Sequence, residues 1–72
     1  MKINQLIQKA TDAHQQGKFD QAEKLYWQIL EIQPTNTAIH NNLGVILDTI
    51  KRYDEAVAIY KKATKLKPDY TI

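Results

Sequence analysis

The chain has 72 residues, of which 43% are hydrophobic and 25% are charged, and its formal net charge is +2. This length allows one small domain with a modest core, and this charge is too small to argue for nucleic acid by itself. The absence of cysteine excludes disulfides, thiolate zinc sites and cysteine nucleophiles, and it fits a reducing compartment.

The N-terminal segment MKINQLIQKATDAH carries polar residues at every third or fourth place. It therefore lacks the unbroken apolar centre of a signal peptide. No apolar run in the sequence approaches the roughly 18 residues that a membrane span requires. We expect a cytoplasmic module without a membrane partner.

Apolar residues recur every three or four positions through four successive segments, which is the spacing of amphipathic helices. The predicted helices cover residues 3–16, 19–32, 36–50 and 53–66. Gly17 ends the first of them, because glycine readily adopts left-handed backbone angles. Pro34 and Pro68 end the second and the fourth, because proline disfavours the helical conformation of its predecessor. The predicted fold class is all-α.

Short polar side chains at the predicted boundaries are typical of helix caps. Thr35 and Asn36 are both suitable N-caps for the third helix, and Asp69 suits a fifth helix. Acidic residues begin the second and fourth helices, and lysines gather at the end of the fourth. That arrangement complements the helix dipole.

Displacing the sequence by 34 residues lays one half of the chain on the other. The shift places Pro34 on Pro68 and Tyr26 on Tyr60, and it aligns GKFDQAEKLY with KRYDEAVAIY. A 34-residue unit of two helices, with a small residue in the first and an alanine and an aromatic in the second, resembles the tetratricopeptide repeat (TPR) family.

The resemblance covers nearly the whole chain, as repeat 1 (residues 3–36) and repeat 2 (residues 37–70). The final residues, 69–72, are either the start of a truncated third repeat or a free tail. The implied fold is a pair of antiparallel helical hairpins from an α-solenoid.

Small residues stand where two helices of a hairpin must approach closely. They are Ala10, Ala22, Gly44 and Ala56. Glycine within a helix costs about 1 kcal/mol relative to alanine, so we expect close packing at Gly44 to compensate. Tyr26 and Tyr60 are long enough to fill the wedge between neighbouring hairpins.

Residues that carry chemistry are few and scattered. His14 and His40 lie 26 positions apart on different helices, without the spacing of a metal-binding pair, and His40 occupies a position where the family has a large packing residue. Paired acids such as Asp54 and Glu55 lie at helix starts, where the dipole accounts for them. Serine is absent, and the two glycines form no phosphate-binding loop. We therefore expect no enzyme, no cofactor and no metal site.

A basic cluster in the last 22 positions supports a third function, weak nucleic-acid binding. It contains Lys51, Arg52, Lys61, Lys62, Lys65 and Lys67. Acidic residues are interspersed among these bases, and no strip of aromatic residues accompanies them for base stacking. A solvated helix end is the simpler interpretation, and nucleic acid is not the expected partner.

Trp27 aligns with Lys61 in the repeat, whereas its neighbour Tyr26 takes the position in the inter-hairpin wedge. Adjacent helical residues point about 100° apart, so Trp27 is expected on an outer surface. There it either packs against neighbouring side chains or belongs to a contact patch.

The resemblance implies that the first helix of each repeat lines an inner surface that holds an extended peptide. The implied peptide-binding positions are Asn4, Gln8, Thr11, Gln15, Ala38, Asn41, Asn42, Val45 and Thr49, with Ile7, His14 and Asp48 beside them. The string NNLG is similar to the TPR arms of protein-glycosylating transferases, whose inner asparagines hold a peptide by its backbone. An amide suits that task, because it both donates and accepts hydrogen bonds.

Family members that grip a C-terminal carboxylate use Lys and Asn at the positions of Ile7 and Thr11. Of that pattern only Asn42 is present here. The resemblance therefore disfavours a carboxylate clamp.

Two repeats are fewer than the three or so that such arrays usually need, so apolar residues at the C-terminal end are expected to be partly uncovered. These self-association candidates are Leu47, Ile50, Val57, Tyr60 and Leu66. The sequence predicts a protein- or peptide-binding module that either continues into further repeats or self-associates. The alternative is a homo-oligomerisation or scaffold segment of a longer TPR protein or enzyme.

Overall fold

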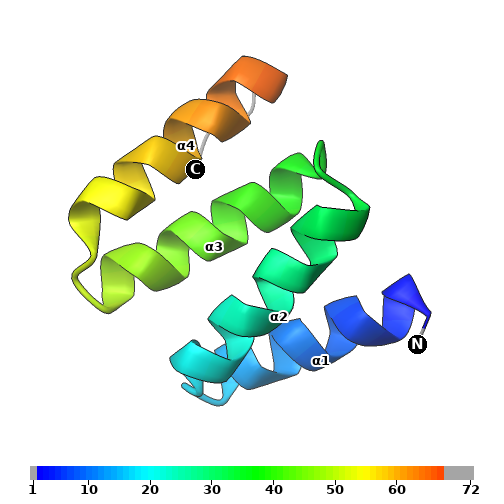
Figure 1. Cartoon of the computed structure of the whole chain (residues 1–72). Coiled ribbons are helices and arrows are strands. Elements are labelled where there is room, and N and C mark those ends of the chain that lie inside the picture. Colours follow the sequence, from blue (N-terminus) through cyan, green and yellow to red (C-terminus); the bar gives the residue numbers. More distant parts are fainter. Residues whose placement is uncertain (1, 68–72) are drawn as a thin grey trace.

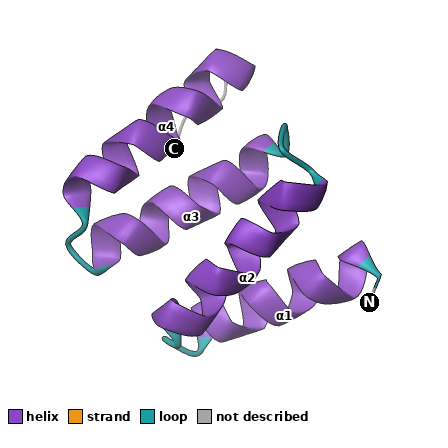
Figure 2. Ribbon diagram, in the orientation of Figure 1, coloured by secondary structure: helices purple, strands orange, loops and turns teal. Residues whose placement is uncertain are grey.

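The computed structural model describes residues 2–67, and these form four α-helices and no strand. The helices are α1 (Ile3–Gln15), α2 (Phe19–Ile32), α3 (Thr37–Thr49) and α4 (Tyr53–Leu66). Figure 2 shows them joined by short loops. The predicted all-α class is confirmed, and no predicted helix bound differs from the observed one by more than one residue.

The four helices form two stacked hairpins. α1 packs against α2 and α3 packs against α4, each pair antiparallel, and the two hairpins meet where α3 lies against α2 (Figure 1). α3 therefore has a neighbouring helix on two sides. Among the described residues, no helix has the length and the apolar character needed to cross a membrane.

The turn inside each hairpin contains one residue with a left-handed backbone. Gly17 has φ 77° between α1 and α2, and Lys51, exactly one repeat later, has φ 67° between α3 and α4. A side chain disfavours this conformation by about 1–2 kcal/mol. The second turn therefore keeps the backbone shape of the first without the glycine that would relieve it.

Asn36 is the N-cap of α3. Its Oδ1 accepts a hydrogen bond from the backbone N–H of Ile39 at 3.1 Å, and its Nδ2 donates to Oε1 of Gln33 at 2.8 Å. Asn36, rather than Thr35, thus satisfies a free amide of the first turn. The predicted stop at Pro68 and the predicted cap at Asp69 lie outside the described residues.

The core contains small residues at the positions where the repeat predicts a close approach of two helices. Ala10 and Ala22 are fully buried, and Gly44 lies under the ring of Tyr60. A methyl group on Gly44 would lie 2.5 Å from Cε1 of Tyr60, which is closer than two carbon atoms can approach. The expectation of close packing at this glycine is confirmed.

Leu47 corrects one expectation about the C-terminal end. It was predicted to be partly uncovered, but its exposed fraction is 0%. The reason is that α3 is an interior helix, so the side chains on its flanks are covered by α2 and α4.

Candidate functional site

Three helices meet at the hydroxyl group of Tyr26. This fully buried side chain of α2 shares a 3.1 Å hydrogen bond between its Oη and Nδ1 of His14 on α1. The two rings pack edge to face, with centroids 6.0 Å apart. Burial raises the pKa of Tyr26, and the nearby side chain of Asn42 on α3 acts in the opposite direction. The phenol therefore lies where α1, α2 and α3 come together.

The two asparagines of the NNLG string occupy different environments. Asn42 is half-buried and its side chain lies near the Tyr26 hydroxyl. Asn41 is only 6% exposed, and its Nδ2 is buried without a hydrogen-bond partner. An unpaired buried donor costs about 1–3 kcal/mol. Of the two asparagines, Asn42 is therefore the more accessible to solvent.

The remaining inner-surface candidates are accessible, but several are engaged locally. Nε2 of Gln8 donates to Oδ1 of Asp12 at 2.9 Å. The hydroxyl of Thr11 donates to the carbonyl oxygen of Ile7 at 3.1 Å, and that of Thr49 donates to a carbonyl one turn earlier at 2.8 Å. Thr11 and Val45 are half-buried, and the others are exposed. The exposed members are Asn4, Gln8, Gln15, Ala38 and Thr49.

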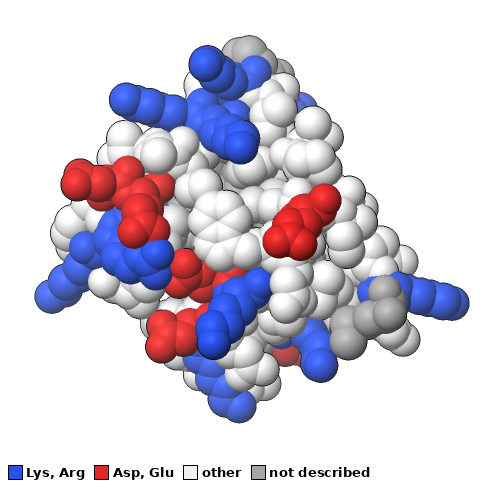
Figure 3. All heavy atoms as spheres, in the orientation of Figure 1, with Lys and Arg blue, Asp and Glu red and all other residues white. Residues whose placement is uncertain are grey.

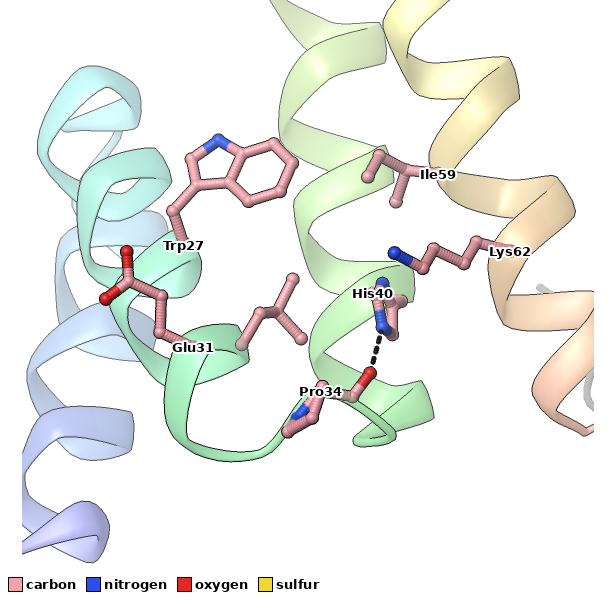
Figure 4. A pocket seen from close by; sticks show the side chains of 7 residues that line it. Trp27, Glu31, Pro34, His40, Ile59 and Lys62 are labelled. Atoms are coloured by element: carbon pink, nitrogen blue, oxygen red, sulfur yellow. Dashed lines mark hydrogen bonds between the residues drawn. The ribbon is translucent and has the colours of Figure 1, made fainter.

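A pocket of about 430 Å³ lies between α2 and α4, above the start of α3 (Figure 4). This α2–α4 pocket is lined by Trp27, Leu30, Glu31, Pro34, His40, Ile59 and Lys62. Trp27 is 42% exposed, as expected for an outer position, and its Nε1 donates to Oε2 of Glu23 at 3.2 Å. The sequence pattern did not reveal the pocket, because its residues come from three helices and share no spacing.

A second, shallower hollow of about 590 Å³ lies on the outer side of α4. This C-terminal hollow is lined by Val57, Tyr60, Lys61, Thr64 and Lys65. Val57 is 50% exposed and Leu66 is 39% exposed, while Ile50 and Tyr60 are half-buried. Four of the five self-association candidates are therefore at least partly accessible, and Leu47 is not.

The charges on the surface are mixed. Figure 3 shows acidic and basic side chains close together on one face, with basic side chains gathered near the end of α4. Arg52 forms an ion pair with Glu23 of the other hairpin at 2.7 Å and a second with Glu55. Part of the basic cluster is thus paired within the chain. The described residues contain no group of three or more side chains that could hold a metal ion.

Comparison with known proteins agrees with the internal repeat. Residues 13–71 match the family model described as tetratricopeptide repeat. The chain is 31% identical over 62 residues to the Hsp70-Hsp90 organizing protein of Triticum aestivum, a match that covers 86% of this chain and 11% of that protein. It is 31% identical over 76 residues to the STIP1 homolog of Dictyostelium discoideum, covering 96% of this chain and 14% of that one.

A third relative is the inactive TPR repeat-containing thioredoxin TTL3 of Arabidopsis thaliana, which is 30% identical over 67 residues. That match covers 93% of this chain and 10% of the relative. The chain therefore spans only about a tenth to a seventh of the length of these relatives.

Proposed function

The chain belongs to the tetratricopeptide repeat family, and on this basis we propose that it is a non-catalytic interaction module that holds an extended peptide on its inner surface. The observation that carries the proposal is the half-buried side chain of Asn42, which lies near the Tyr26 hydroxyl at the junction of the two repeats. An amide at this junction can donate to a peptide carbonyl and accept from a peptide N–H.

The proposed ligand is gripped by its backbone rather than by a terminal carboxylate. Two relatives carry the words organizing protein or STIP1 in their names, and the first name refers to Hsp70 and Hsp90. In this chain, however, apolar Ile7 and hydroxyl-bearing Thr11 occupy the positions where carboxylate-gripping members carry Lys and Asn. Amidation of a bound peptide's C-terminus should therefore leave its affinity unchanged.

The test is a peptide-array screen followed by fluorescence anisotropy with the peptides that bind. Asn42→Ala should weaken binding about five- to tenfold, because it removes one or two hydrogen bonds of about 0.5–1.5 kcal/mol each. Gln28→Ala, which removes an exposed amide of α2 outside the candidate set, is the matched control. Thermal melts of both variants separate lost binding from lost folding. Equal affinities of Asn42→Ala and wild type would contradict the proposal.

A scaffold role is the second candidate, and the C-terminal hollow favours it. Val57 presents an apolar side chain to solvent beside the half-buried Tyr60. Burial of such a surface against a further repeat or a second copy of the chain would be favourable. A cytoplasmic location also remains a prediction.

A further inference from the structure

The α2–α4 pocket is separate from the inner surface, and its walls are of two kinds. Trp27 and Leu30 of α2 and Ile59 of α4 form the apolar part. The polar part consists of His40, Glu31 and Lys62, and in Figure 4 Lys62 extends from α4 toward the His40 ring. Such a combination of apolar walls and a few convergent polar groups is typical of sites for amphipathic ligands.

The hydrogen bond to Pro34 determines the protonation pattern of His40. Nε2 of His40 lies 2.9 Å from the carbonyl oxygen of Pro34, which can only accept, so Nε2 carries the proton. In the neutral ring Nδ1 is then an acceptor. This atom is buried and has no hydrogen-bond partner, and the residue as a whole is only 2% exposed. A ligand that donates a hydrogen bond to Nδ1 would remove this unfavourable situation, once the exposed Lys62 side chain beside the ring moves aside.

The charged residues restrict the ligand further. Lys62 supplies N–H donors near the ring, so a ligand atom that both donates to Nδ1 and accepts from Nζ fits best. A carboxylate or an ionised phosphate carries no proton to donate to Nδ1, and Glu31 on the α2 side balances the positive charge of Lys62. A neutral hydroxyl group meets these conditions, whereas a carboxylate or a phosphate does not.

We propose that the α2–α4 pocket binds a tyrosine side chain of a partner protein. The phenol ring lies against Trp27, Leu30 and Ile59, and its hydroxyl donates to Nδ1 of His40 and accepts from Nζ of Lys62. A phenylalanine fills the same walls but leaves Nδ1 unpaired, and a phosphorylated tyrosine has lost the phenolic proton that Nδ1 would accept. The site is independent of peptide binding on the inner surface, so either proposal can fail without the other.

The experiment uses the whole chain and two probes that differ by one hydroxyl group, N-acetyl-tyrosinamide and N-acetyl-phenylalaninamide. Trp27 is the single tryptophan of the sequence, so its indole N–H resonance reports occupancy, and the nitrogen resonances of His40 report the new hydrogen bond. The tyrosine probe should bind about three- to tenfold more tightly than the phenylalanine probe, which is the effect of one hydrogen bond. It should shift both signals.

Two variants locate the hydroxyl group. Lys62→Met keeps the apolar stem and should reduce the preference for the tyrosine probe, whereas Lys61→Met, which removes a charge from the C-terminal hollow, should leave it unchanged. Phosphorylation of the tyrosine probe should abolish binding. Equal binding of the two unmodified probes, no shift at Trp27, or tighter binding of the phosphorylated probe would each overturn the proposal.

Discussion

Gly44 and Tyr60 fit closely together in the second hairpin. A methyl group at Gly44 would meet three atoms of the Tyr60 ring within 2.5–2.8 Å. In repeat 1 the equivalent pair is Ala10 and Tyr26, and both are fully buried. The two hairpins thus solve the same packing problem with different small residues, and only the second requires the complete loss of a side chain.

We predict that Gly44→Ala destabilises the chain in spite of alanine's better helix propensity. Overpacking costs about 1–3 kcal/mol, and the change of propensity returns about 1 kcal/mol, so we expect a net loss of about 1 kcal/mol. In a Tyr60→Ala background the ring is absent, and the same substitution should become neutral or stabilising. Urea unfolding of the four proteins gives the coupling energy. An identical effect in both backgrounds would show that the ring is not what excludes the methyl group.

At the scale of the helix, α3 differs from its neighbours in how it begins. It is the one helix of the described residues with a side-chain hydrogen bond at its N-cap, from the N–H of Ile39 to Asn36. α3 also carries His40, Asn41 and Asn42 in its first two turns. The cap therefore determines where these three side chains lie relative to α2.

We predict that Asn36→Ala lowers the free energy of unfolding by about 1 kcal/mol, the usual value of an N-cap. Thr35→Ala removes the neighbouring cap candidate, whose side chain is exposed, and should change stability by less than about 0.5 kcal/mol. Thermal or urea unfolding measures both. The assignment of the cap would be wrong if Thr35→Ala were the more damaging of the two substitutions.

At the scale of the whole molecule, the two faces at the ends of the stack are unlike. α1 and its C-cap carry exposed polar residues at the positions that are one repeat before the α2-facing side of α3. They are Gln5, Lys9, Asp12 and Gln16. The corresponding positions of α3 carry Ile39, Leu43, Ile46 and Ile50. The C-terminal hollow, by contrast, combines apolar Val57 with Lys61 and Lys65. Head-to-tail stacking of two copies is therefore poorly matched, and pairing of two C-terminal hollows brings like charges together.

We predict that any self-association through the C-terminal hollow strengthens several-fold with salt. Between roughly 0.01 and 0.15 M salt the screening length falls from about 30 to about 8 Å, which weakens the repulsion between lysines of the two copies. Sedimentation equilibrium at two protein concentrations measures the effect. Val57→Lys should abolish association, and Ala58→Lys, an exposed position of α4 outside the hollow, should not. A chain that stays monomeric at every salt concentration would eliminate self-association.

Periodic and local features of the sequence predicted much of this fold. The 34-residue shift, the spacing of apolar residues and the turn at Gly17 depend on neighbours along the chain, so they identified four helices with nearly correct bounds. They also identified Gly44 as a point of close approach, because an unfavourable residue in a helix needs a compensating contact. The sequence did not decide whether Thr35 or Asn36 is the N-cap of α3, since both residue types make good caps. The backbone of the structure shows that it is Asn36.

Other features depended on how the helices cross. Leu47 and Asn41 are both buried because α3 lies between α2 and α4. The small number of repeats had suggested that Leu47 would be partly uncovered, and the family resemblance had placed Asn41 on the inner surface. The Tyr26 hydroxyl meets Asn42 only because the two hairpins stack.

The sequence by itself thus determined the repeat, the helices and the family, because those properties are encoded in spacing along one chain. The tertiary structure alone decided which polar groups remain unpaired and what surrounds them. Trp27, His40 and Lys62 belong to three different helices, and they line one pocket because of the angle at which those helices pack. No periodicity in the sequence encodes that angle directly, since it arises from the fit of side chains across the helix interfaces.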